Sequence, residues 1–367
     1  MPSKIVYLFG SGATHAEKWL DCRIRNIESN IDKDGLLAAN VSSRIIESIL
    51  RKKKNNILEK YGISRDELKK HQLMWGEDPL EKKYPGVDVE LLISLIKNIK
   101  TKTAENDAKD LMQYFRDDIC EKLKTGSRQI IPKLYPALLR WHELNEPKEK
   151  LLGFLTVNYD SLIEKSFKSL KKSFDLGFNV ENNKSFGIKQ KANEDRVPLL
   201  KLHGSFNWVV DNDGNGKITL TENEDNSIES LWIPPGLNKI YLDYPYNIIH
   251  GRAFELLSEC NVLRIVGCSL NQNDINLISL LFTTQKVRRL NPYSIELIMG
   301  DKAAGDIAER LVMLIPFKDS FYEIVRGQSE YRGENPFLEW LYYNVKNSGV
   351  NVGRDKYLKD IEKWTKL

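Results

Sequence analysis

The sequence is poor in cysteine and has no long hydrophobic run near its start. Its four cysteines among 367 residues are Cys22, Cys120, Cys260 and Cys268, and no two of them form a CxxC pair. Scattered cysteines without paired spacing predict neither a tetrahedral zinc site nor disulfide bonds. The first apolar run, Ile5 to Phe9, is far shorter than an export signal or a membrane span requires. We therefore expect a cytoplasmic protein without a structural metal.

An excess of charge of one sign is also missing. Lysine and arginine number 55 against 51 acidic residues, which gives a net charge of +4, too small at this length to indicate a nucleic-acid partner. The basic run Arg51 to Lys54 is typical of a solvated helix face, so direct nucleic-acid binding is disfavoured. Hydrophobic residues make up 41% and charged residues 29%, values typical of a globular protein with a core.

Four short apolar runs, each followed by small or polar residues, organise the chain. They end at Gly10-Ser11-Gly12-Ala13-Thr14, Thr156-Val157-Asn158-Tyr159-Asp160, Leu202-His203-Gly204-Ser205 and Gly267-Cys268-Ser269-Leu270. Strand, turn and helix in this order predict an open α/β sheet, in which ligands bind at the carboxyl ends of the strands. We therefore predict a Rossmann-like parallel sheet with a ligand site along one edge.

Each strand end, taken alone, has a second interpretation. The glycine turn suits a phosphate, because glycines allow close backbone approach and the next helix presents free N–H groups, but without a full GxGxxG pattern it equally fits a tight turn. Asn158 and Asp160 can grip a polar ligand or cap the following helix. An isolated histidine such as His203 is more often a packed residue than a base. The residues alone leave these alternatives open.

A long helical stretch interrupts the strand signals. Residues 1–20 and 148–300 carry the predicted sheet, and residues 21–147 predict a helical insertion. Residues 301–367 predict a mainly helical C-terminal part packed on this core. The helical windows of the insertion are Leu36–Lys53, Val87–Lys100, Ala104–Lys124 and Lys133–Leu144.

The ordered set of four strand ends resembles the sirtuin family, in which a glycine turn, a T-x-N-x-D strand end, an HG and a G-x-S share one NAD site. Within this family the chain is similar to the sirtuin-like NADases of bacterial anti-phage defence, through the stretches NYD, HGSFNW and Val87-Asp88-Val89-Glu90-Leu91-Leu92. It departs from the protein deacylases, because no GIPDFR-like stretch follows the glycine turn and their four zinc cysteines are missing. The resemblance implies NAD+ as the substrate.

This resemblance implies a role for each motif. His203 is expected to act as general base or as partner of a ribose hydroxyl, Asn158 to position the ribose or the attacking water, and Asp160 to hold the carboxamide region or add negative potential near the cation. Because nicotinamide carries positive charge in NAD+ and leaves neutral, neither a general acid nor a metal is required. The pyrophosphate is expected to lie against Gly10, Ser11, Gly12, Ala13 and Thr14, and the adenosine side against Gly267 and Ser269.

The function implied by the resemblance is that of an NAD+ glycohydrolase that depletes NAD+ as an effector in anti-phage defence. A freely active NADase would deplete its own cell's cofactor, so we expect a regulated homo-oligomer or a complex with a HerA-like ATPase or another sensor protein. ADP-ribose and a cyclic form are both compatible products. The alternative functions are a sensor of NAD+ or ADP-ribose derivatives without turnover, and a protein deacylase, which the missing zinc cysteines disfavour.

Overall fold

The computed structural model divides the chain into two compact units, which are described separately. The first comprises Met1–Glu28, Thr125–Ile233 and Ile240–Leu367, and the second Ser29–Lys124 and Pro234–Lys239. None of the helices in the described part of the chain is both long enough and apolar enough to cross a membrane. The residues that the structure describes are 1–27, 35–51, 57–61, 89–178, 196–210, 218–221, 230–234, 242–271, 274–288, 290–314, 324–325 and 335–347.

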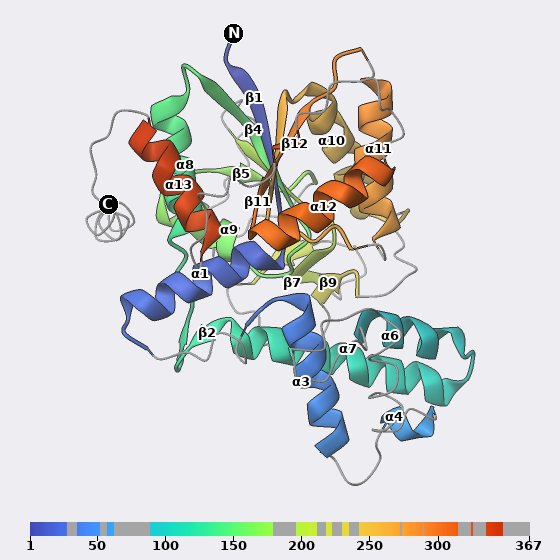
Figure 1. The fold of residues 1–367 in the computed structure, drawn as a ribbon. Coiled ribbons are helices and arrows are strands. Elements are labelled where there is room, and N and C mark those ends of the chain that lie inside the picture. Colours follow the sequence, from blue (N-terminus) through green and yellow to red (C-terminus); the bar gives the residue numbers. More distant parts are fainter. Residues whose placement is uncertain are drawn as a thin grey trace. The chain divides into compact units, whose positions relative to one another are not determined.

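A seven-stranded sheet with the order β12-β11-β10-β1-β4-β6-β5 forms the centre of the first unit (Figure 1). Neighbouring strands run parallel, so the predicted Rossmann-like parallel sheet is confirmed. The edge strands β5 and β12 have two residues each, too few to produce a hydrophobic run in the sequence. The strands are β1 (Ser3–Phe9), β4 (Glu149–Thr156), β5 (Phe174–Asp175), β6 (Val197–Lys201), β10 (Val262–Val266), β11 (Ser294–Ile298) and β12 (Ile324–Val325).

Strand β1 lies in the middle of this sheet and is buried on both faces. All residues from Ile5 to Phe9 are fully buried, which explains an unbroken apolar run in place of an alternating pattern. At its end Phe9 lies opposite Thr156 of β4 on one side and Val266 of β10 on the other. The strand order reverses between β1 and β10, and open α/β sheets bind ligands in the crevice at such a reversal.

Helices cover both faces of the sheet (Figure 1). Helices α1, α8, α9 and α13 pack together on one face, and α10 and α11 pack on the other. A small antiparallel sheet, with β7 between β8 and β9, begins directly after His203. The bounds are α1 (Ser11–Ile24), α8 (Leu134–Asn145), α9 (Leu162–Ser169), α10 (Tyr246–Glu259), α11 (Ile275–Val287), α12 (Asp301–Leu314), α13 (Pro336–Asn347), β2 (Lys124–Thr125), β3 (Arg128–Gln129), β7 (Gly204–Val210), β8 (Ile218–Leu220) and β9 (Ser230–Trp232).

The described residues of the second unit are mainly helical, with α3 (Ala38–Arg51), α4 (Ile57–Lys60), α6 (Val89–Asn98) and α7 (Lys102–Lys122). Arg44 of α3 pairs with Asp118 of α7 at 2.6 Å. Helix α8, which the sequence placed in the insertion, lies in the first unit. Residues 87–88 of the segment used for the resemblance lie outside the described residues.

A buried carboxylate of α1 holds the start of α8. Glu17 Oε2 accepts hydrogen bonds from the backbone N–H groups of Lys133 (2.6 Å) and Leu134 (3.0 Å), and Oε1 accepts one from Tyr135 (2.8 Å). N–H groups at the start of a helix have no partner within the helix, so Glu17 acts as the cap of α8. Burial raises the pKa of Glu17 to about 7, although the three N–H donors act in the opposite direction.

The raised pKa of Glu17 predicts a loss of stability as the pH rises towards neutrality. Because the carboxyl ordinarily has a pKa of 4.5 and the folded value is about 7, the folded state holds the proton more tightly. Its contribution to the free energy of unfolding is therefore complete below the lower value and is lost as the pH rises to the upper one. A shift of this size corresponds to on the order of 3 kcal/mol. Urea unfolding of wild type and Glu17→Gln across this range measures it, and an equal slope in both proteins contradicts the prediction.

Candidate active site

The four predicted motifs lie at the carboxyl ends of four adjacent strands. In the sheet order, β10, β1, β4 and β6 are neighbours. Gly10 follows β1 directly, Val157 follows β4, Leu202 follows β6 and Gly267 follows β10. Because these strands are parallel, all four ends meet at one edge of the sheet. The fold therefore brings together the segments that the sequence assigned to one site.

The two glycine-containing turns, after β1 and after β10, pack backbone against backbone. The N–H of Gly12 donates to the Gly267 carbonyl at 2.8 Å. A Cβ on Gly267 would lie 2.5 Å from the Ala13 nitrogen, and one on Gly10 would lie 2.5 Å from the Cys268 Cα. Gly267 also has a φ of +55°, in the left-handed region. These glycines therefore allow two turns to touch.

The contact between the two turns also limits which N–H groups of the turn after β1 can face a ligand. Besides Gly12, the N–H groups of Gly10 and Ala13 donate within the protein, to the carbonyls of Val266 (3.0 Å) and Gly10 (2.9 Å). Three of the five residues predicted to bind the pyrophosphate therefore already use their N–H groups in hydrogen bonds within the protein. The turn serves local packing in addition to any contact with a phosphate.

Thr14 links the glycine turn to the two predicted site residues after β4. Its hydroxyl accepts a hydrogen bond from Asn158 Nδ2 (2.9 Å) and donates one to Asp160 Oδ2 (2.6 Å). Asn158 Nδ2 also donates to the Gly10 carbonyl at 2.8 Å. All three side chains are buried. Asn158 and Asp160 are therefore held in fixed orientations by one hydroxyl from the first turn of α1.

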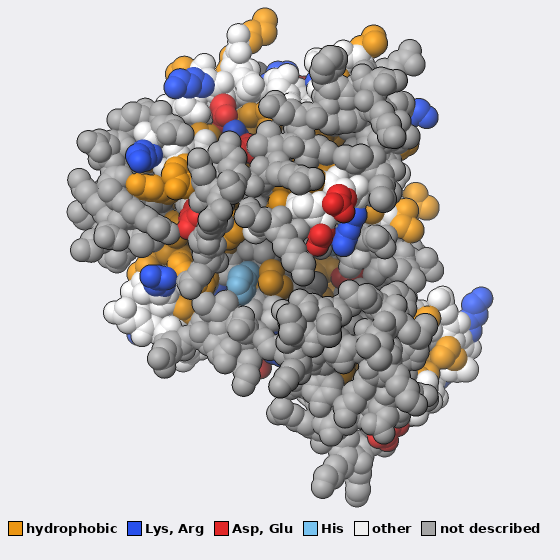
Figure 2. All heavy atoms as spheres, in the orientation of Figure 1, with side chains coloured by type: hydrophobic (Ala, Val, Ile, Leu, Met, Phe, Trp, Pro, Cys, Tyr) orange, Lys and Arg blue, Asp and Glu red, His pale blue; other side chains and the backbone are white. Residues whose placement is uncertain are grey.

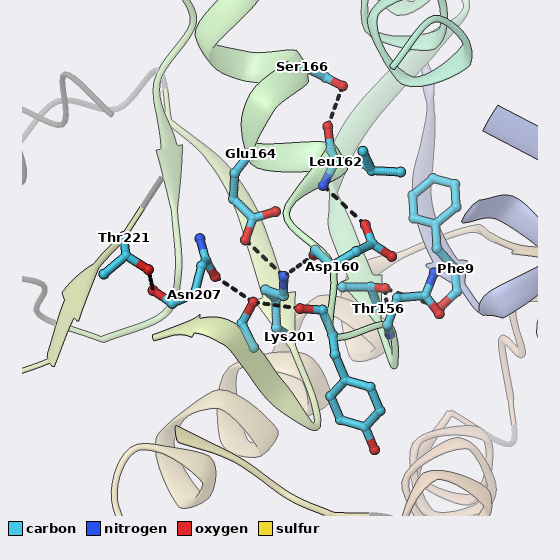
Figure 3. A network of polar contacts seen from close by, with 12 residues as sticks. Phe9, Thr156, Asp160, Leu162, Glu164, Ser166, Lys201, Asn207 and Thr221 are labelled. Carbon is cyan, nitrogen blue, oxygen red and sulfur yellow. Dashed lines mark hydrogen bonds and ion pairs between the residues drawn. The ribbon is translucent and has the colours of Figure 1, made fainter. Parts of the chain in front are cut away.

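Asp160 has a structural task as well. Its Oδ1 accepts a hydrogen bond from the Leu162 N–H, the first residue of α9, at 3.1 Å. Its backbone carbonyl accepts one from Lys201 Nζ, which also lies 2.9 Å from Glu164 Oε1. Figure 3 shows the Lys201 ammonium between these two groups. Asp160 therefore caps α9 through Oδ1, as one of its two interpretations expected, while Oδ2 accepts the hydrogen bond from Thr14.

The fully buried pair of Lys201 and Glu164 was not predicted from the sequence. Both side chains have almost no exposed surface, and burial raises the pKa of Glu164 while the Lys201 charge opposes the shift. The only sign of this buried pair in the sequence is the lysine inside the apolar run PLLKL. A buried charge needs a partner, and this one anchors the backbone between Asn158 and α9.

His203 follows β6 and is 5% exposed. Its Nε2 lies 2.8 Å from Oδ2 of Asp274, and Asp274 is the N-cap residue of α11, with its side chain accepting from the Leu277 N–H. The next residue, Gly204, has a φ of +75°, and a Cβ there would lie 2.5 Å from the Leu231 carbonyl oxygen. Glycine thus lets the chain turn sharply from His203 into β7.

Aromatic side chains and a second imidazole surround His203. Tyr159, between Asn158 and Asp160 in the sequence, has its ring centre 6.2 Å from that of His203 and is stacked on Phe206 at 5.0 Å. His250 Nε2 lies 3.3 Å from the Leu202 carbonyl oxygen. Burial lowers the pKa of His250 to about 4, with a smaller effect of the His203 charge in the same direction. His250 is therefore neutral at physiological pH.

Ser269 lies apart from this group of side chains. It is exposed, and its carbonyl accepts a hydrogen bond from Arg310 of α12 at 3.2 Å. Contact of Ser269 with the adenosine side of NAD+ stays a prediction.

Among the described residues, no three His, Cys, Asp or Glu side chains are grouped as metal ligands. On the face shown in Figure 2, basic and acidic side chains are scattered among apolar ones.

Comparison with known proteins finds a family match over part of this region. A family model of the SIR2-like domain matches residues 153–294, a range that includes Asn158, His203 and Asp274 but not the glycine turn after β1. Similar solved structures are a mutant Sir2 homologue with ADP-ribose (12% identity, TM-score 0.39, 95% of both chains covered), and Sir2 with a p53 peptide and NAD+ (12% identity, TM-score 0.35, 95% of this chain and 94% of the other). A comparison with curated proteins found no match.

The contact between the two turns predicts a large cost for Gly267→Ala. The new Cβ would overlap the backbone of Gly12 and Ala13 and force a left-handed alanine, which together should destabilise the protein by about 2–4 kcal/mol. Gly305→Ala in α12 is the matched control, because nothing lies within 4 Å of an added Cβ there, and alanine in a helix should stabilise by up to about 1 kcal/mol. Urea unfolding measures both, and equal stabilities would contradict the packing.

Proposed function

We propose that the protein is an NAD+ glycohydrolase that cleaves the bond between nicotinamide and ribose. The observation that carries this proposal is the backbone connection of the His203 segment to the Asn158 segment. The Leu202 N–H donates to the Thr156 carbonyl at 2.9 Å, and the Phe206 N–H donates to the Tyr159 carbonyl at 3.0 Å. A base and an amide at neighbouring strand ends are thereby held in register. The SIR2-like match over the same residues supports NAD+ as the ligand.

The side chains at this edge fit the requirements of the reaction. Hydrolysis breaks the bond between C1′ of the ribose and the nicotinamide nitrogen, whose electron pair leaves with neutral nicotinamide, and water oxygen bonds to C1′. One proton of that water must be accepted, and His203 is the group proposed for this step. Asn158 would orient the ribose or the water, and the Asp160 charge would favour the developing cation. The products are nicotinamide, ADP-ribose and one proton.

Two alternatives compete with hydrolysis. A sensor of NAD+ or ADP-ribose derivatives needs a binding edge but not a base, so the buried, oriented His203 favours turnover. A protein deacylase is disfavoured by the absence from the sequence of the four cysteines that hold zinc in the deacylases.

The biological part of the proposal rests on the sequence resemblance. We assign the catalytic core to residues 1–20 and 148–300, with 21–147 as an insertion and 301–367 as a part packed on the core. The protein would deplete NAD+ in the cytoplasm during anti-phage defence. A regulated homo-oligomer, or a HerA-like ATPase or other sensor protein as partner, would restrain it.

The proposal predicts that the purified protein releases nicotinamide from NAD+, alone or with its partner present. His203→Ala and Asn158→Ala should each lower kcat by about 10²–10⁴-fold, because each removes a group that acts on the reacting atoms. Lys4→Ala is the control, because its ion pair with Glu259 is solvent-exposed. Circular dichroism should show that all variants fold. Substantial release by either site variant would refute the mechanism, and tight binding of NAD+ without cleavage would favour the sensor.

The hydroxyl of Thr14 provides a second prediction. Thr14→Val keeps the shape but leaves Asn158 Nδ2 and Asp160 Oδ2 without that partner, so kcat for nicotinamide release should fall while KM changes little. Thr14→Ser keeps the hydroxyl and should retain most of the activity. Steady-state kinetics of the two variants make the comparison, and full activity in Thr14→Val, or a loss in Thr14→Ser as large as that in Thr14→Val, would contradict the role of the hydroxyl.

A further inference from the structure

We infer that Asp274 is a positioning residue for His203 and stabilises the imidazole when it accepts a proton. This inference rests on the proposed hydrolysis of NAD+. Asp274 lies outside the four predicted motifs. The residue reaches the site from the start of α11, on the opposite side of β1 from β6, the strand that precedes His203.

Each oxygen of the Asp274 carboxylate faces a nitrogen. Oδ1 accepts from the Leu277 N–H in the first turn of α11, and Oδ2 lies 2.8 Å from His203 Nε2. The N-terminal end of a helix favours a negative charge, so α11 favours the ionised carboxylate. The side chains of Asp274 and His203 are each 6% exposed, and an interaction so shielded from water is stronger than one at the surface.

This arrangement gives the two imidazole nitrogens of His203 different tasks. With the carboxylate beside Nε2, the proton of the neutral ring is favoured on Nε2, so a proton gained during the reaction goes to Nδ1. The positive charge that this transfer creates then lies next to the Asp274 carboxylate. Such a carboxylate lowers the energy of the protonated base without taking the proton itself.

Among the described residues, His250 is a second imidazole that interacts with Asp274. Its Nε2 is directed to the Leu202 carbonyl, and burial keeps its pKa at about 4, so it carries no charge at neutral pH. His203 is therefore the imidazole whose charge Asp274 would compensate. A purely capping role for Asp274 is separable from this one, because asparagine caps helices as well as aspartate does.

Asp274→Asn tests the inference, since it keeps the cap and removes the charge. We expect kcat for nicotinamide release to fall by about 10²-fold or more, with KM within about threefold of wild type, because the affected step is proton transfer and not binding. Asp175→Asn, which breaks a partly exposed pair with Arg252, is the matched control and should leave both constants near wild type. An unchanged kcat, or a rise in KM alone, would overturn the positioning role.

A second measurement tests the pairing of Asp274 with His203 without relying on nicotinamide release. The chain has five histidines, so ¹⁵N spectra of the imidazoles can be assigned with His203→Gln and His250→Gln. We expect the His203 ring of wild type to carry its proton on Nε2, and the Asp274→Asn ring to shift towards the other tautomer. Identical His203 signals in the two proteins would overturn the pairing. If wild type releases no nicotinamide but these signals differ, the hydrolysis fails and the pairing stands.

Discussion

The contact between the turns after β1 and β10 is the constraint on which the edge of the sheet depends. At this point the strand order reverses, and the turns that follow the paired strands β1 and β10 meet through the backbones of Gly12 and Gly267. A side chain at either position would push the halves apart. Because α1 begins at Ser11 and Gly12 lies in its first turn, the same contact fixes where Thr14 points.

Thr14 in turn orients two of the proposed catalytic side chains. Its hydroxyl fixes Asn158 and Asp160, and the Asp160 backbone is anchored in turn by Lys201. Burying so many polar groups is costly unless each is partnered. Here the partners are largely backbone groups and side chains of neighbouring strands, so the orientation of the amide follows from the folding of the sheet. A site built in this way is preorganised before any ligand binds.

The sequence predicted the sheet well because its central strands are buried on both faces. The run before Gly10 is continuous and apolar for this reason, and three further runs end in small or polar residues. Ordered motifs therefore located Asn158 and His203, but the partners of these residues could not be read from them. Asp274 lies 71 positions beyond His203 in the sequence and reaches it only because α11 starts beside the end of β6. Lys201 received no role from the sequence, since its partner Glu164 is on α9.

The position of Asp274 has a consequence for how the site is assembled. His203 and Asn158 come from strands on one side of β1, whereas Asp274 follows β10 on the other side. His203 and Asp274 are therefore juxtaposed only when the two halves of the sheet are joined, through the pairing of β1 with β10 and the glycine contact beyond it. A change that separates the halves slightly would weaken a charge interaction that falls with distance, while the hydrogen bonds among Thr14, Asn158 and Asp160 would persist. The glycine turns thus support the site through packing as much as through any contact with a phosphate.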